Sequence, residues 1–237
     1  MDHIDLRQDL AATFRWCERL GLNEGVANHF SAAINEDGSR FLVNPEGRYW
    51  SQLRASDMIE VDAHNLGAAS GVDRTAAAIH GALHRRLPRA RVVMHLHSRY
   101  ATVLSTLSDP TLPPIDQSSM RFYNRVAIDS GFDGMGLGDE AERLAGCLGN
   151  HSILMMGQHG VLVVGDGIGA CFDQIYYFER AAETYILALQ TGRPLNVASA
   201  DVAEKTARQW DDYDGSGETH LAAIREVLDA EAPDYLN

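Results

Sequence analysis

Residues 91–97 of the chain read Arg-Val-Val-Met-His-Leu-His, and residues 152–164 read Ser-Ile-Leu-Met-Met-Gly-Gln-His-Gly-Val-Leu-Val-Val. Short apolar runs next to turn residues are typical of buried strands, so the first stretch predicts one strand and the second predicts two, 152–156 and 161–164. We expect a helix after a cap at Ser98 and a long helix from Gly169 to Leu189. This alternation of buried strands and helices indicates an α/β fold.

The remaining segments continue the alternation along the chain. Helices are expected at 4–20, 75–87, 140–148, 200–211 and 218–230. Strand-like runs occupy 30–34, 41–43, 58–61 and 126–129, and residues 109–116 are expected to form a proline-containing loop. Because no stretch reads as a domain linker, we expect one domain over residues 1–237, with a polar, acidic helical segment from about residue 199 that presents a solvated face.

The charge balance argues against two classes of partner. The 237 residues include 20 Lys+Arg against 33 Asp+Glu, which gives a formal charge of −13. This charge opposes binding to DNA and to acidic lipid surfaces. Residues 1–7 lack the basic and apolar regions of a secretion signal, and no apolar run approaches the length of a membrane span, about 18 residues. We therefore expect a soluble, cytoplasmic protein that binds neither nucleic acid nor membranes.

The composition also argues against several kinds of catalysis. Lys205 is the only lysine, and its neighbours Asp201 and Glu204 indicate an exposed helical face. Schiff-base chemistry, pyridoxal phosphate attachment and a P-loop all need a suitably placed lysine. The three cysteines, Cys17, Cys147 and Cys171, are odd in number and far apart, which predicts reduced thiols that serve in packing.

His95 and His97 are the first candidate metal ligands. Side chains two apart on a strand leave the same face, so both imidazoles can meet one cation while Leu96 points into the core. His159 is the best third ligand, because glycines on either side let its turn approach closely. Three imidazoles predict an open catalytic site with one divalent metal per chain, for which Zn²⁺, Mn²⁺, Co²⁺ and Fe²⁺ all fit. The alternative, two surface histidines on an edge strand, is disfavoured by the apolar residues 92–94.

His80 and His84 form a second histidine pair with a different expected role. Their spacing of four residues is that of a helical metal pair, but the glutamate of the HExxH motif is missing. Their helix must also bury Ile79, Leu83 and Leu87. We therefore expect His84 to be a capped or solvated histidine.

Several motifs occur together in an order that is specific to one family. They are Asn28-His29-Phe30-Ser31, Asn44-Pro45-Glu46-Gly47, Ile79-His80, His95-Leu96-His97-Ser98, residues 117–123 and Gln158-His159-Gly160-Val161. In this order the chain resembles the class II, metal-dependent aldolase/adducin-head family from about residue 6 to residue 190. Within that family it is similar to the decarboxylase-like branch.

The resemblance implies a fold, a metal site and an assembly. The fold would have three layers, α/β/α, around a central mixed and largely antiparallel sheet. His95, His97 and His159 stand where the aldolases of the family hold their divalent metal, whereas the adducin heads lack this set. The resemblance thus favours an enzyme over a scaffold. It also implies a homotetramer with active sites at subunit contacts.

The chain departs from the sugar-phosphate aldolases at positions that matter for function. Those aldolases carry a catalytic glutamate four residues before the helix histidine, where this chain has Ala76. A carboxylate at Glu46 would repel a substrate phosphate. At the positions where those aldolases bind the substrate phosphate, we expect this chain to bind a substrate carboxylate or its neighbouring groups. The candidate substrate ligands are Asn28, His29, Ser31, Arg74 and Thr75, together with Arg121 from further along the chain. A structural ion pair is the alternative role for each arginine.

Three functions follow from these features. The first is a metal-dependent decarboxylase of a small hydroxylated aromatic or ring-cleavage carboxylic acid, in which His80, Tyr123 or metal-bound water returns a proton to carbon. The second is a class II aldolase of an unphosphorylated hydroxy or oxo substrate. The third is a metal-free, adducin-like interaction protein. Metal content separates the third from the two enzymes, and release of CO₂ separates the first from the second.

Overall fold

The computed structural model describes residues 1–131, 134–213 and 215–237, and its centre is one seven-stranded sheet. The strand order is β3-β2-β1-β4-β7-β6-β5. The bounds are β1 (His29–Ala33), β2 (Arg40–Val43), β3 (Ile59–Asp62), β4 (Val92–Leu96), β5 (Val126–Asp129), β6 (Ile153–Met156) and β7 (Gly160–Gly165). Six of these strands form antiparallel neighbours, and only β5 and β6 pair in parallel. The expected mixed, largely antiparallel sheet is confirmed.

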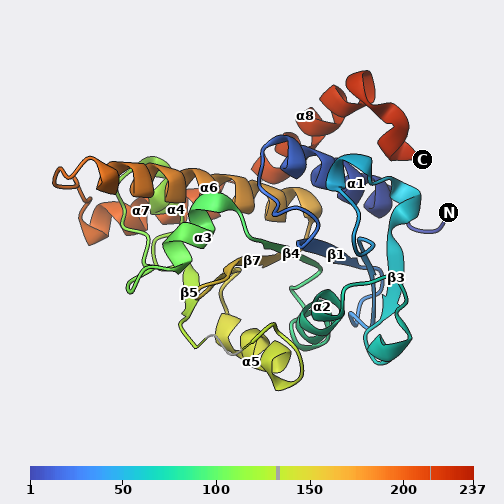
Figure 1. Cartoon of the computed structure of the whole chain (residues 1–237). Coiled ribbons are helices and arrows are strands. Elements are labelled where there is room, and N and C mark those ends of the chain that lie inside the picture. The colour runs from blue at the N-terminus through green and yellow to red at the C-terminus, as the bar shows by residue number, and fades with distance from the viewer. Residues whose placement is uncertain (132–133, 214) are drawn as a thin grey trace.

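Helices cover both faces of this sheet (Figure 1). One face carries α2 (Arg74–Arg86) and α5 (Asp139–Leu148). The other face carries a larger layer of α1 (Ile4–Arg19), α3 (Arg99–Ser105), α4 (Gln117–Arg121), α6 (Ile168–Gln190), α7 (Ala200–Asp211) and α8 (Ser216–Glu231). The three-layer α/β/α architecture is therefore confirmed.

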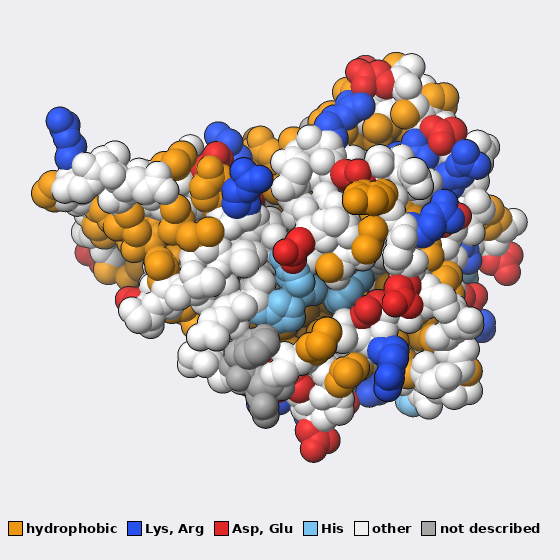
Figure 2. All heavy atoms as spheres, viewed as in Figure 1, with side chains coloured by type: hydrophobic (Ala, Val, Ile, Leu, Met, Phe, Trp, Pro, Cys, Tyr) orange, Lys and Arg blue, Asp and Glu red, His pale blue; other side chains and the backbone are white. Residues whose placement is uncertain are grey.

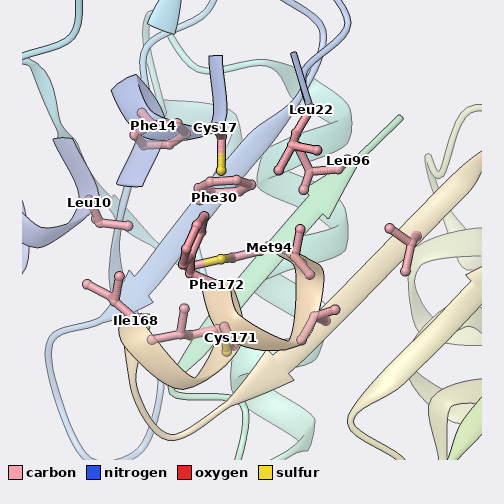
Figure 3. Packing of buried hydrophobic residues seen from close by; sticks show 14 of the residues in the cluster. Leu10, Phe14, Cys17, Leu22, Phe30, Met94, Leu96, Ile168, Cys171 and Phe172 are labelled. Carbon is pink, nitrogen blue, oxygen red and sulfur yellow. Dashed lines mark hydrogen bonds between the residues drawn. The ribbon is translucent and has the colours of Figure 1, made fainter. Parts of the chain in front are cut away.

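The alternation of side chains on β4 assigns residues to the two cores. Met94 and Leu96 join the core beneath α1 and α6, where Phe14 and Phe30 stack with ring centroids 4.7 Å apart. Figure 3 shows these side chains converging with Phe172 of α6. Residues of opposite parity on β4 face the core beneath α2 and α5. His95 has the parity of this second face, so the sheet itself decides on which side the histidines gather.

The acidic C-terminal segment forms the two expected helices and also contributes to the core. Leu221, Ile224 and Leu228 of α8 are buried in the core that α1 and α6 share. The acidic residues of α8 are exposed, so the segment combines a solvated face with a buried one. Cys17 and Cys171 are buried free thiols, in agreement with a packing role.

Two details near α3 and α4 differ from the expectation. Ser98 lies at the N-cap position of α3, but its hydroxyl donates to Glu179 and does not cap the helix. The carboxylate of Glu179 caps the helix instead, because it accepts from the backbone N–H groups of Tyr100 and Ala101. The five-residue helix α4 was not predicted, because so short a segment shows no periodicity; a capping box at Asp116 begins it.

Within the described ranges, no helix is long and apolar enough to cross a membrane.

Candidate metal centre

His95 and His97 lie at the end of β4 on the face of the sheet toward α2. His95 is 1% exposed, and its Nδ1 donates to the carbonyl oxygen of Val161 on β7 at 3.1 Å. His97 follows the last strand residue, Leu96, whose side chain lies in the opposite core. The two Nε2 atoms are 3.0 Å apart. The strand alternation predicted from sequence therefore brings both imidazoles to one point.

Glu24 orients His97 from outside the strand. Its Oε2 atom lies 2.6 Å from Nδ1 of His97, and the backbone N–H of Glu24 donates to Oδ1 of Asn28 at 2.7 Å. A carboxylate on the far nitrogen of a histidine fixes the tautomer and makes the other nitrogen a better metal ligand. Glu24 was not predicted from the sequence, because no spacing rule connects the loop after α1 with the end of β4.

His159 completes the cluster from the turn between β6 and β7. Its ring centroid lies 4.8 Å from that of His95 and 4.7 Å from that of His97. Gln158 has a left-handed backbone with φ 57°, and a Cβ at Gly160 would collide with the carbonyl of Leu96. Gly160 is thus needed for the close approach of the turn to β4, as the flanking glycines predicted.

The donor chemistry of this cluster fits one divalent cation. The ligand atoms of His95, His97 and His159 all lie within 4.8 Å of one another. Nδ1 of His95 donates its hydrogen to the carbonyl of Val161, and Nδ1 of His97 donates to Glu24. In the neutral rings each Nε2 then presents a lone pair to the other, an arrangement that a cation between them would stabilise. Burial lowers the pKa of His95 well below its usual range, and burial is also the main reason that the pKa of His159 falls to about 4. Neutral imidazoles are the form that binds metal.

His29 lies beside this cluster, on the neighbouring strand. It pairs with His95 in the register of β1 and β4, and their ring centroids are 5.0 Å apart. Burial lowers the pKa of His29 to about 4, and the carboxylate of Asp73 opposes this shift. Nδ1 of His29 lies 2.7 Å from Nε2 of His80. Of the expected substrate ligands, His29 is the one that the structure brings next to the three histidines.

His80 and His84 are both fully enclosed behind His29. His80 has no exposed surface, and its Nδ1 bonds the hydroxyl of Ser31. Ser31 also bonds Nε2 of His84 at 2.7 Å, and Nδ1 of His84 bonds the carbonyl oxygen of Ala90 at 2.6 Å. His84 is therefore buried rather than solvated. His80, which the sequence suggested as a proton donor, reaches the centre only through His29.

The start of α2 holds the other expected substrate ligands. Asp73 caps the helix and accepts from the backbone N–H groups of Thr75 and Ala76 at 2.8 and 3.0 Å. The Thr75 hydroxyl also donates to Asp73. Arg74 is exposed and makes no hydrogen bond or ion pair with the described residues. Its guanidinium is available to a ligand, whereas the Thr75 hydroxyl serves the helix cap.

Asn28 and Ser31 are buried, with 1% and 0% exposure. Oδ1 of Asn28 accepts from Glu24, whereas its buried Nδ2 has no hydrogen-bond partner among the described residues; the hydroxyl of Ser31 bonds both His80 and His84. Ala76 is 1% exposed and belongs to an apolar cluster with Phe41 and other residues of the β2–β3 region. The helix position that holds a glutamate in the sugar-phosphate aldolases thus lies among hydrocarbon groups here.

Arg121 and Tyr123 lie at the end of α4, where the structure gives them contacts with α6 and α7. Arg121 donates to the buried Asp173 at 2.8 Å and lies over the ring of Trp210, 4.9 Å from its centroid. This is the structural ion pair considered as the alternative role. Tyr123 follows α4, and its carbonyl accepts from Arg125 at 2.7 Å. Both residues belong to the layer that α4 forms with α6 and α7.

The centre opens to solvent in a hollow. Figure 2 shows histidine side chains at the bottom of this hollow on the viewed face, with acidic side chains at its rim. A small molecule can therefore reach the histidine cluster from this side.

The chain is similar to known proteins both in sequence and in fold. The family model described as class II aldolase and adducin N-terminal domain matches residues 8–186. Decarboxylase NovR of Streptomyces niveus is 28% identical, over 90% of this chain and 82% of that protein. An aldolase II superfamily protein from Pseudomonas syringae superposes with a TM-score of 0.91 at 27% identity, covering 99% of this chain and 96% of that one. L-fuculose 1-phosphate aldolase from Glaciozyma antarctica gives a TM-score of 0.83 at 25% identity, with 97% and 92% of the two chains covered. The chain belongs to the class II aldolase and adducin N-terminal domain family.

Proposed function

We propose that the protein is a metal-dependent carbon–carbon lyase that removes CO₂ from a small hydroxylated aromatic or ring-cleavage carboxylic acid. The observation that carries this proposal is the convergence of His95, His97 and His159 with their ligand atoms within 4.8 Å. These three residues would hold one divalent cation per chain, Zn²⁺, Mn²⁺, Co²⁺ or Fe²⁺. The similarity to a protein named decarboxylase NovR supports the carboxy-lyase assignment.

The reaction breaks the bond between the carboxyl carbon and its neighbour. CO₂ leaves, the electron pair stays on the neighbouring carbon, and a proton replaces the carboxylate there. A bound metal supplies Lewis-acid withdrawal of these electrons. Arg74, exposed and unpaired at the start of α2, binds the substrate carboxylate through its planar guanidinium.

The surroundings of Ala76 favour decarboxylation over aldol cleavage. Aldol chemistry moves a proton to or from a positioned acid/base group, an effect of about 10²- to 10⁴-fold in rate. Ala76 supplies no such group, and its apolar neighbours would not accommodate a carboxylate. Glu46 is exposed beside the loop that precedes α2, where its negative charge disfavours a phosphate dianion. Decarboxylation needs only a proton donor to the carbon that loses CO₂, and it does not need a carboxylate at position 76.

A class II aldolase acting on an unphosphorylated hydroxy or oxo substrate is the second candidate. The close superposition with L-fuculose 1-phosphate aldolase favours it. The third candidate, a metal-free interaction protein of the adducin type, would not explain why three imidazoles converge at one point.

We further propose that the protein is a homotetramer with shared active sites. Tyr123 follows α4, which packs against α6 and α7, and in the proposed assembly its side chain would serve the active site of a neighbouring subunit. Apolar side chains are exposed on and near α6 and α7, among them Leu187 (45%), Val202 (50%) and Tyr213 (66%). Figure 2 shows hydrophobic side chains gathered at that end of the molecule. An interface between copies would cover this surface.

The deciding experiment measures two products in parallel. Ortho-hydroxy aromatic acids, ring-cleavage acids and fuculose- or rhamnulose-type phosphates are offered to the metal-loaded enzyme, and CO₂ and aldehyde are both quantified. We expect CO₂ from an acid and no aldehyde from the phosphates. Aldehyde without CO₂ would contradict the carboxy-lyase assignment and show that the protein is an aldolase. His151→Ala, which removes an exposed histidine, is the control for His97→Ala, which should abolish turnover.

A further inference from the structure

We propose that Ser31, His80 and His84 are positioning residues which fix the tautomer of His29, so that its Nε2 lone pair accepts a hydrogen bond from a substrate hydroxyl group. The substrate part rests on the function proposed above, and it names the group next to the carboxylate that the site selects. The tautomer part stands on contacts within the chain. Those contacts link β1, α2 and the segment before β4.

The four side chains form one continuous chain of hydrogen bonds. Nδ1 of His84 lies 2.6 Å from the carbonyl oxygen of Ala90, and Nε2 of His84 lies 2.7 Å from Oγ of Ser31. Oγ of Ser31 bonds Nδ1 of His80, and Nε2 of His80 lies 2.7 Å from Nδ1 of His29. Each member is buried, with an exposure of 3% or less.

The Ala90 carbonyl sets the direction of every donor in this chain. A carbonyl oxygen only accepts, so Nδ1 of His84 carries the hydrogen. A neutral His84 then has a bare Nε2, which must accept from the hydroxyl of Ser31. The Ser31 oxygen in turn accepts from Nδ1–H of His80. Nε2 of His80 is therefore bare and accepts from Nδ1–H of His29.

The hydrogen bonds cannot easily run in the opposite direction, because two acceptors, Nδ1 of His84 and the carbonyl oxygen of Ala90, would then face each other. Reversing every bond would leave a bare Nδ1 on His84 only 2.6 Å from the oxygen of Ala90. In a dry interior such a contact is costly, because neither group can turn to water. Burial also keeps these rings neutral and lowers the pKa of His84 to about 4. The charged groups that face the chain are Arg91 near His84, which favours neutrality, and Asp73 near His29, which opposes it.

The free end of this chain faces the metal centre. Nδ1 of His29 is directed at His80 in α2, so Nε2, on the other side of the ring, points away from the helix. The ring of His29 contacts that of His95, with their centroids 5.0 Å apart. The ring of His29 makes no second hydrogen bond within the described part of the chain. A bare nitrogen there accepts from a donor such as a hydroxyl, whereas an ether oxygen has no hydrogen to offer.

The direct test reads the tautomers by ¹⁵N NMR of histidine-labelled, Zn²⁺-loaded protein. We expect a pyrrole-type Nδ1 and a pyridine-type Nε2 signal for His29, His80 and His84. Ser31→Val and Ser31→Thr have nearly the same shape and differ in the hydroxyl group. Ser31→Thr should keep the wild-type pattern, and Ser31→Val should shift the signals of His80 and His29. If neither branched residue folds, Ser31→Ala removes the hydroxyl without added bulk.

A binding experiment tests the substrate part without turnover. The probes are salicylate and 2-methoxybenzoate, measured by calorimetry on the same Zn²⁺-loaded proteins. We expect wild type and Ser31→Thr to bind salicylate at least about tenfold more tightly than 2-methoxybenzoate. The methoxy group has no hydrogen to donate, so Nε2 of His29 would be left without a hydrogen-bond partner in that complex. The preference should shrink at least about threefold in Ser31→Val.

Three results would overturn the inference. One is a protonated Nε2 on His29 in the wild type. Another is an unchanged pattern and an unchanged preference in both Ser31→Val and Ser31→Ala. The last is a loss of bound Zn²⁺ in His29→Ala, which would make His29 a metal ligand. Absence of CO₂ release together with the expected tautomers and preference would contradict the proposed reaction while leaving this inference intact.

Discussion

The carboxylate of Glu24 lies 2.6 Å from Nδ1 of His97, although the Glu24 side chain is 68% exposed. An exposed acid thus holds one of three converging imidazoles with its other nitrogen toward the centre. This contact sets the tautomer that a metal needs, and it raises the basicity of the ligand.

We expect Glu24→Gln to weaken metal binding about 10- to 100-fold, because an amide replaces the charged acceptor of His97. Competition with a metal indicator measures the affinity. Glu36→Gln, another exposed acid, is the matched control and should bind metal like the wild type. Equal affinities in the two variants would show that Glu24 plays no part in metal binding.

His97→Ala should leave the protein far below one divalent metal per chain. Two imidazoles remain in this variant, which is fewer than the three protein ligands of an open catalytic site. Elemental analysis of native protein gives the stoichiometry directly, and His151→Ala should retain the full complement. A metal-poor wild type that behaves like His97→Ala would remove the enzyme assignment altogether.

Acid should destabilise the metal-free protein through its buried histidines. The pKa of His84 falls from 6.5 to about 4 on folding, mainly because burial disfavours its charged form. The unfolded chain therefore binds the extra proton between these values, so the stability that His84 contributes is complete above pH 6.5 and is lost as pH falls toward 4. The shift from 6.5 to about 4 corresponds to a loss of about 3 kcal/mol.

Urea unfolding in the presence of a chelator, from pH 7 down to pH 4, measures this dependence. His84→Gln should show a shallower pH dependence of the free energy of unfolding, and the exposed variant His151→Gln should keep the wild-type slope. Identical slopes in wild type and His84→Gln would contradict the prediction.

Gly160→Ala should destabilise the protein and loosen the metal centre together. The added Cβ would collide with the backbone carbonyl of Leu96 and lie 3.2 Å from the ring of His97. Overpacking of this kind costs about 1–3 kcal/mol. Gly146→Ala in α5 adds the same atom into open space and should be neutral or stabilising. Thermal unfolding and metal titration of the pair give both readouts.

The two candidate arginines should respond differently to removal. Arg74→Gln should raise KM for the acid substrate without changing stability, because the Arg74 guanidinium has no partner among the described residues. Arg121→Gln should lower stability, because Asp173, with a side chain only 3% exposed, loses a charged donor. Kinetics and thermal unfolding of both variants check the contrast. A rise in KM confined to Arg121→Gln would reverse the two assignments.

The sequence by itself predicted most of the helices and strands and the three candidate metal ligands. Apolar runs gave the strands at residues 92–96, 153–156 and 160–165 within one or two positions, because burial on both faces needs apolar side chains at every position. The spacing of His95 and His97 put both on one face, since side chains alternate along a strand. Glycine at position 160 predicted the close approach of His159.

Only the tertiary structure decided which distant groups meet. Glu24 bonds His97, Ser31 joins His80 to His84, and Arg121 is paired with Asp173, although no periodicity relates the members of these pairs. Periodicity reports the face toward which a side chain points, whereas its partner depends on the strand order and on the helix packed above it. The antiparallel pairing of β1 with β4 places His29 opposite His95, and the packing of α2 over both strands buries the histidine chain behind them.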